Sequence, residues 1–229
     1  MLKWKGVDVT NKGIIVEHIP TITKGKKRIT VYDVEGRNGF LYLDNGTYEP
    51  FALTVGCHFD ENVADFDAIK SYLDGYGTLQ LQSDRQYTAI INNAIDFEKI
   101  AQAHFRKFAI SFLVNPIAYA TSSTSISITS SATTFSISSA TAEMEPIITL
   151  KGSGDASFTF NNKTFYLSSM NSSLTYTLDC FNKVIVDNNG LNCADQMLYS
   201  FPVLQPGTNS VSYSGALTAF NITYNEAYL

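Results

Sequence analysis

The sequence has little charge, little cysteine and no long apolar run, and each shortage excludes a class of protein. Charged residues make up 16% of the 229 residues, against about 25% in ordinary globular proteins, so the surface is polar rather than ionic. Three cysteines are too few, and odd in number, for a disulfide-stapled miniprotein. The 14 glycines and 6 prolines follow no collagen period. No run of about 18 apolar residues occurs, and the N-terminus has no apolar signal-peptide core, so we expect no membrane insertion.

The few positive charges are concentrated near the N-terminus. Residues 1–40 contain eight of the sixteen Lys and Arg residues, whereas residues 109–229 contain only Lys151, Lys163 and Lys183, and the net charge is −5. Because nucleic-acid binding depends on many cations that reach phosphates, we expect neither sequence-specific nor sequence-independent binding of nucleic acid. One basic cluster, residues 24–28, is best interpreted as a solvated hairpin turn. The alternative is an interface or channel-lining loop.

The residues that most often carry catalysis or bind metals show no functional pattern. Neighbouring Cys57 and His58 point to opposite faces of a strand, and Cys180 and Cys193, which are thirteen positions apart, do not match the close pairs of zinc sites. We therefore expect three buried thiols, no metal and no cofactor. The histidines and the adjacent acids lack a nucleophile motif or a facing carboxylate pair, so no catalytic residue is predicted. These residues are His18, His58, His104, Asp60/Glu61, Asp65/Asp67 and Glu143/Glu145.

The first half of the chain alternates with the period of two that is typical of strands. Strands are predicted over 29–34, 40–43, 48–59, 78–82, 87–91 and 107–114, with a turn at 44–46, a bulge at Gly56 and an end at Asn115-Pro116. One helix is predicted over about 62–74, capped by Asn62, with Phe66, Ile69, Leu73 and Val63 on one apolar face. This helix is expected to pack on its own sheet.

The second half begins with a tract in which 15 of residues 121–141 are Ser or Thr. The tract still alternates over 125–129 and 134–138, which predicts strands rather than a linker. Short strands and tight turns follow, a pattern typical of an all-β sandwich. We expect a mainly β protein with an N-terminal β domain at 1–119, which contains the helix, and a C-terminal β-sandwich at 120–229.

Several short motifs follow one another over nearly the whole chain. Residues 36–40 are Gly-Arg-Asn-Gly-Phe, a helix then leads into Gly-x-Gly-x-Leu at 75–79, and an aromatic-rich strand ends at Asn115-Pro116. In the second half, residues 142–148 open the domain, and residues 201–211 contain Pro-x-Leu-x-Pro-Gly-x-Asn. This order of motifs resembles the distal tail proteins (Dit) of siphophages, which have a similar Gly-Arg-x-Gly-aliphatic element and a similar closing pattern.

The resemblance implies a structural virion protein at the tail tip, made in the host bacterial cytoplasm. Its N-terminal domain would be a tail-tube-like β-sandwich or barrel that builds a homohexameric ring, and its C-terminal domain would be galectin-like. The ring would join the major tail tube protein to the tail-associated lysin or hub protein of the baseplate. It would let DNA pass, and it would also contact the tape-measure protein and a receptor-binding protein for host attachment.

Ring formation needs exposed loops and strand edges. The residues that we expect at the ring interface or lumen are Lys24, Lys26, Lys27, Arg28, Arg37 and Asn38.

Two other function classes remain open at this stage. A carbohydrate-binding adhesion module that contacts the host cell wall is the main alternative. The sequence lacks the galectin motif His-x-Asn-x-Arg, however, and its second half contains no Trp. A wall hydrolase is disfavoured, because no acid pair or nucleophile motif supports it.

Overall fold

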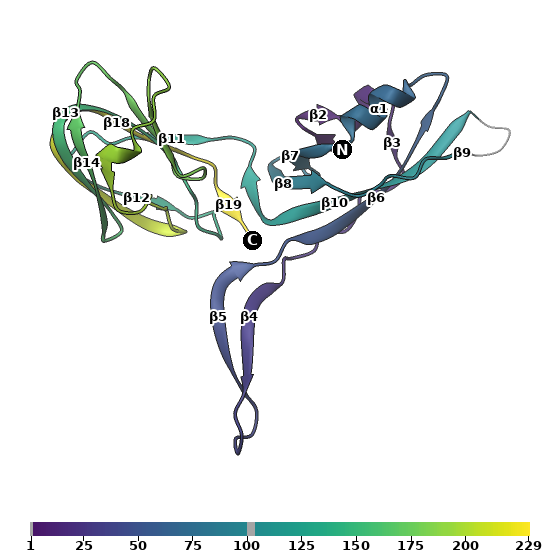
Figure 1. Ribbon diagram of the computed structural model, residues 1–229, viewed down its shortest axis with the longest axis horizontal. Helices are drawn as coiled ribbons and strands as arrows, with labels where there is room; N and C mark the ends of the chain where they lie inside the picture. The colour runs from purple at the N-terminus through teal and green to yellow at the C-terminus, as the bar shows by residue number, and fades with distance from the viewer. Residues whose placement is uncertain (1, 100–103) are drawn as a thin grey trace. The chain divides into compact units, whose positions relative to one another are not determined.

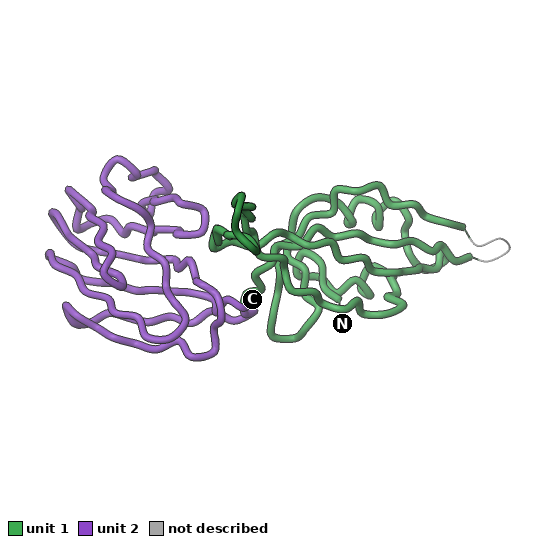
Figure 2. Tube along the Cα trace, turned by 90° about the horizontal axis from the view of Figure 1, so that it is seen from below, with its two compact units in different colours: residues 1–119, 229 green, residues 120–228 purple. Residues whose placement is uncertain are grey.

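The computed structural model describes residues 2–99 and 104–229 and has a mainly β fold. The chain divides into two compact units, residues 1–119 with residue 229 (unit 1) and residues 120–228 (unit 2), as Figure 2 shows. The described residues contain one α-helix, so the predicted mainly β class with one helix is confirmed.

The elements follow one another along the chain as Figure 1 labels them. The first part of the chain forms β1 (Lys3–Trp4), β2 (Val7–Asp8), a 3-10 turn (Val9–Lys12), β3 (Ile15–Val16), β4 (Lys27–Asp33), β5 (Phe40–Tyr48), β6 (Phe51–Asp60), α1 (Phe66–Tyr72), β7 (Gly75–Gln80), β8 (Arg85–Ile91), β9 (Glu98–Lys99) and β10 (Phe105–Ala120). The rest forms β11 (Thr124–Ser127), β12 (Ala132–Ile137), β13 (Ile147–Phe160), β14 (Lys163–Met170), β15 (Tyr176–Asp179), β16 (Val184–Asp187), a 3-10 turn (Ala194–Gln196), β17 (Met197–Leu198), β18 (Gly207–Tyr224) and β19 (Ala227–Tyr228).

The main sheet of unit 1 runs in the order β2-β1-β7-β8-β10-β6-β3. Its longest antiparallel pair joins β6 and β10, from Phe105 opposite Asp60 to Val114 opposite Phe51. Every second residue is buried over 53–59 in β6 and over 108–114 in β10, as the strand period requires. Trp4, the single tryptophan, is fully buried and lies 5.2 Å from the Phe112 ring. The buried core residues of β6 and β10 are Leu53, Val55, Cys57, Phe59, Phe108, Ile110, Phe112 and Val114.

Helix α1 is shorter than the sequence predicted. Asp65 caps it, because its Oδ1 accepts hydrogen bonds from the Asp67 and Ala68 N–H groups at 3.0 and 3.3 Å. The predicted cap, Asn62, instead lies in a turn and donates its N–H to Asp60. Ile69 and Leu73 are buried as expected, but Val63 precedes the helix and is 80% exposed. No helix within the described residues is long and apolar enough to cross a membrane.

Two predicted interruptions of unit 1 strands do not occur. Strand β10 continues beyond Asn115-Pro116, because its pairing with β6 ends at Val114 and no bond of that ladder needs the missing Pro116 N–H. Gly56 lies in regular register opposite Ala109, so it forms no bulge. A side chain at Gly56 would instead approach the Glu17 carboxylate.

The main sheet of unit 2 runs in the order β11-β18-β13-β14-β17. Strands β13 and β18 are long, where the sequence predicted short strands and tight turns, and their pairing shifts register near Gly152 and Ser153. The core is aromatic: the Phe158 and Phe165 rings stack at 4.9 Å, and Phe220 meets Phe158 edge-on at 5.4 Å. Cys180 and Cys193, like Cys57, are buried free thiols, as predicted.

Asp187 at the end of β16 makes the stability of unit 2 depend on pH. Its Oδ1 accepts from the Leu191 and Asn189 N–H groups at 2.9 and 2.8 Å, and these bonds lower the pKa of the carboxyl. The stabilisation is therefore present above the unfolded pKa of about 4 and is lost as pH falls through the lower folded pKa. We expect the Asp187→Asn variant to show a shallower loss of unfolding free energy below pH 4 in urea titrations, and an unchanged slope would contradict this role.

Candidate functional site

Strands β4 and β5 form a two-stranded sheet of their own, which we call the arm (Figure 1). They pair antiparallel from Asp33 opposite Phe40 to Lys27 opposite Tyr48. Every residue from 26 to 47 is exposed. An isolated two-stranded hairpin is only marginally stable in water, so the arm gains stability when another surface covers it.

Both faces of the arm carry large apolar side chains. Val31 pairs with Tyr42 on one face, where they are 51% and 66% exposed, and Tyr32 pairs with Leu41 on the other, at 51% and 43%. Contiguous exposed apolar surface of this kind marks sites of protein interaction. The other large apolar side chains that the arm exposes are Ile29, Val34, Phe40 and Leu43.

The base of the arm is anchored by close packing and by charge. A side chain at the buried Gly25 would clash with Pro116, at 2.5 Å from its Cβ, so no larger residue fits there without a shift. The Glu49 N–H donates to the Lys26 carbonyl at 2.7 Å. Lys27 forms an ion pair with Asp44 and lowers the pKa of that carboxyl. The packing of Gly25 against Pro116 therefore ties the base of the arm to β10, and the other two interactions tie the strands of the arm to each other.

The predicted turn at Asp44-Asn45-Gly46 is wrong, because β5 continues through it. Between Lys27 and Ile29 the pairing on β5 advances from Tyr48 to Asp44, which places extra residues in a bulge. The Asp44 Oδ1 accepts from the Gly46 N–H at 2.8 Å, and Gly46 has a φ of 68°, so the Asn-Gly pair closes the bulge rather than a hairpin.

The structure places all six predicted interface residues in or beside the arm. Lys24 and Lys26 precede β4, Lys27 and Arg28 lie on it, and Arg37 and Asn38 lie in the turn that joins β4 to β5. The interpretation of residues 24–28 as a hairpin turn is wrong, because they lead into β4, and the turn of this hairpin lies at 34–39. The two groups thus lie at opposite ends of the arm, and their contact with a ring neighbour or a lumen stays a prediction.

The sequence interpretation missed the apolar residues of the arm. The run Phe40-Leu41-Tyr42-Leu43 has no polar alternation, which places apolar groups on both faces of the strand. Such a run is usual for a strand that is buried on both sides, whereas here both faces are exposed.

The acidic pairs singled out in the sequence make structural contacts. Glu61 pairs with Arg106 and also with Lys99 at 3.2 Å, and Arg106 is the larger cause of the lowered pKa of Glu61. Glu145 accepts from Lys183 at 2.8 Å, and Glu143 accepts from the Gln205 amide at 2.9 Å. Over the described ranges, no group of three or more His, Cys, Asp or Glu side chains could hold a metal ion.

Comparisons with known proteins add the fold family. No protein-family model matches the sequence, and no curated protein does. Among solved structures, the Dit protein of phage SPP1, described as a paradigm of the hub adsorption apparatus in phages that infect Gram-positive bacteria, matches with a TM-score of 0.78. The match covers 100% of this chain and 98% of that chain at 13% identity. The chain has the Dit fold.

Two further matches are chains of the phage P2 baseplate in its activated conformation. The calcium form matches with a TM-score of 0.54 at 9% identity, over 96% of this chain and 92% of that chain. The strontium form matches with a TM-score of 0.51 at 10% identity, over 95% of this chain and 92% of that chain. The resemblance to distal tail proteins that the motif order indicated is therefore shown at the level of the fold.

Proposed function

We propose that the chain is a structural hub of a phage tail tip, in which six copies form a ring between the tail tube and the baseplate proteins. The role needs no catalytic step. The likeness to the SPP1 Dit protein supports it, because the match extends over both chains almost entirely and includes no unmatched domain. The partners would be the tail tube protein on one side and the tail-associated lysin or hub protein on the other, with the tape-measure protein inside.

The exposed apolar arm is the observation that carries the proposal. A monomer would leave the apolar groups of both arm faces in water, whereas the neighbouring copies of a closed ring can cover them. The interface is of the head-to-tail kind, because the arm of one copy meets a different surface of the next. Such an interface closes into a ring when the rotation between copies allows it.

The charge of the chain suits a ring through which DNA passes. A channel that gripped phosphates would slow the DNA, and a chain with 16 cations, 21 acids and a net charge of −5 does not favour such contacts. We place the assembled ring at the virion tail tip.

The mass of the native particle tests the proposal. We expect light scattering to give about 151 kDa, six times the 25.2 kDa of one chain, and negative-stain images of the same fraction to show a central hole. The mass should stay constant on dilution over the micromolar range, as a closed ring requires. A single chain at every concentration would contradict a ring that forms from this protein alone.

A further inference from the structure

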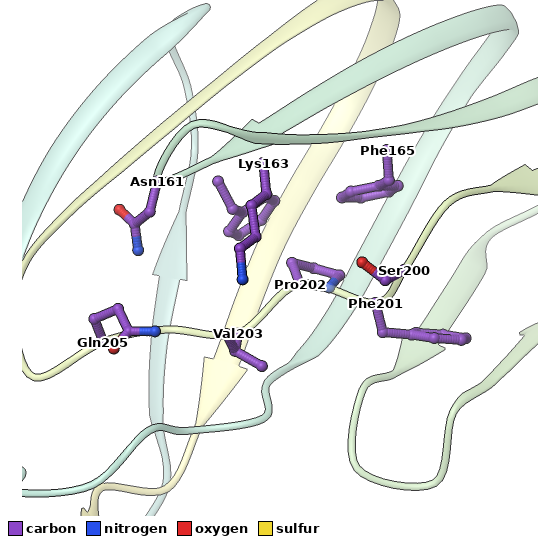
Figure 3. Close-up of a pocket in the computed structure, with 9 residues that line it drawn as sticks. Asn161, Lys163, Phe165, Ser200, Phe201, Pro202, Val203 and Gln205 are labelled. Atoms are coloured by element: carbon purple, nitrogen blue, oxygen red, sulfur yellow. The ribbon is translucent and has the colours of Figure 1, made fainter. Parts of the chain in front are cut away.

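A pocket of about 130 Å³ lies in unit 2, between the turn that joins β13 to β14 and the loop at 200–205 (Figure 3). Its size is close to the roughly 150 Å³ of an apolar protein cavity that holds one benzene ring. It therefore has room for one side chain or one ring. The residues that line it are Phe160, Asn161, Lys163, Phe165, Ser200, Phe201, Pro202, Val203 and Gln205.

The floor and one wall of the pocket are apolar. The Phe160 and Phe165 rings lie 5.9 Å apart, and each residue is 1% exposed. Phe201, Pro202 and Val203 supply the wall opposite them. An apolar group that enters the pocket leaves water and gains the usual hydrophobic free energy.

The loop wall of the pocket is held in place before any ligand arrives. The fully buried Asn209 accepts from the Gln205 N–H at 2.8 Å and donates to the Gln205 carbonyl at 2.8 Å. Leu204 forms two backbone hydrogen bonds of 2.9 Å with Met144. Because these bonds fix the loop in the free chain, binding costs little ordering entropy.

The turn wall is fixed in the same way. Asn161 accepts from the Ser210 N–H at 2.9 Å and donates to the Asn209 side chain at 2.8 Å. Asn161 and Asn162 both have positive φ values, 47° and 69°, which is the left-handed backbone of a tight hairpin turn. This turn sets the position of Lys163, the first residue of β14.

The rim of the pocket is positive. Lys163 reaches from β14 toward the loop that holds Pro202 and Val203, as Figure 3 shows. Among the described residues that line the pocket there is no acid, and the Glu143 carboxylate just outside it is bonded to the Gln205 amide at 2.9 Å. A lysine at a pocket rim is unusual in this half of the chain, which has only three cations, and one of them, Lys183, is paired with Glu145. The rim therefore attracts a negative group.

A saccharide fits this pocket poorly. Each hydroxyl of a sugar ring needs a hydrogen-bond partner when it is buried. The side-chain amides of Asn161 and Gln205 already bond within the protein, to Asn209 and Glu143, so the Ser200 hydroxyl and the Lys163 ammonium are the main polar groups left for several sugar hydroxyls. The apolar floor offers no partner. An apolar side chain with a carboxylate beside it matches both the floor and the rim.

We propose that this pocket docks a peptide segment of a partner protein, with an aromatic or branched aliphatic side chain on the Phe160–Phe165 floor and a carboxylate at Lys163. The partner would be another protein of the tail tip, so this identity rests on the proposed function. The pocket lies in unit 2 and the arm in unit 1, so the two proposals are tested by separate measurements.

The test uses two dipeptides as probes of the full chain. Saturation-transfer NMR would be titrated with N-acetyl-Phe-Asp-amide and with its neutral analogue N-acetyl-Phe-Asn-amide. We expect the acidic probe to bind about threefold to fivefold more tightly, because a rim ion pair contributes modestly. Lys163→Met should remove this difference between the probes, and Val203→Trp should abolish the phenyl signal of both by filling the cavity.

Lys151→Met is the matched control, since it removes another exposed lysine of the same unit outside the pocket, and it should leave the difference intact. Equal affinity of the two dipeptides for the unmodified chain would overturn the proposal. A signal from glucuronic acid that Val203→Trp abolishes, with none from the dipeptides, would overturn it in favour of a glycan site. The native mass of the particle does not depend on either outcome, so failure of the docking proposal can be distinguished from failure of the proposed ring.

Discussion

Replacing Val31 and Tyr42 with aspartate is expected to reduce the particle from about 151 kDa to single chains of 25.2 kDa. The two side chains are cross-strand partners on one face of the arm and are 51% and 66% exposed in the free chain. In a ring, each copy would bury two carboxylates against an apolar neighbour, and an unpaired charge is costly to remove from water. The same cost recurs at each of the six interfaces.

The control for this pair is the double variant Val31→Ile with Tyr42→Phe, which keeps the arm apolar and should keep the ring. The aspartate pair should not lower the thermal midpoint of the isolated chain by more than a few degrees, because neither side chain is buried there. A ring of unchanged mass in the aspartate variant would show that this face of the arm is not an interface.

The sequence predicted the fold best where burial alone decides it. The alternation of β6 and β10 follows from one buried face, and the Ser/Thr tract gave β11 and β12 because it alternates in the same way. Local turn signals were weaker, since Asn45-Gly46 suits a bulge as well as a hairpin, and Pro116 interrupts a strand only where a partner needs its N–H. Those outcomes depend on pairing partners far away in the sequence.

The interface residues predicted from the sequence lie at the two ends of the arm, and their contact with a ring neighbour or a lumen stays a prediction. The sequence contains the apolar run Phe40-Leu41-Tyr42-Leu43, but only the structure shows that both faces of these strands are exposed. The pocket of unit 2 was not predicted at all. Its walls come from residues 160–165 and 200–205, and only the tertiary fold brings these two segments together.

The second large effect is expected in the core of unit 2, where neighbouring aromatic residues of β14 allow a matched comparison. Phe165 is 1% exposed and stacks on Phe158, whereas Tyr166 points to the opposite face and is 44% exposed. We expect Phe165→Ala to lower the unfolding free energy by about 3–5 kcal/mol, through lost burial and the cavity left behind. Tyr166→Ala should cost about 1 kcal/mol or less, because it removes mainly exposed surface.

Chemical denaturation followed by two signals can assign this loss to its unit. Circular dichroism follows the strands of the whole chain, whereas fluorescence of Trp4 reports unit 1 alone, since the sequence has one tryptophan and it is buried there. If each unit has its own core, Phe165→Ala shifts the dichroism transition and leaves the Trp4 transition in place. Equal shifts of both signals would show instead that the two units unfold as one cooperative body. Similar losses of unfolding free energy in the two variants would contradict the placement of Phe165 and Tyr166 on opposite faces of β14.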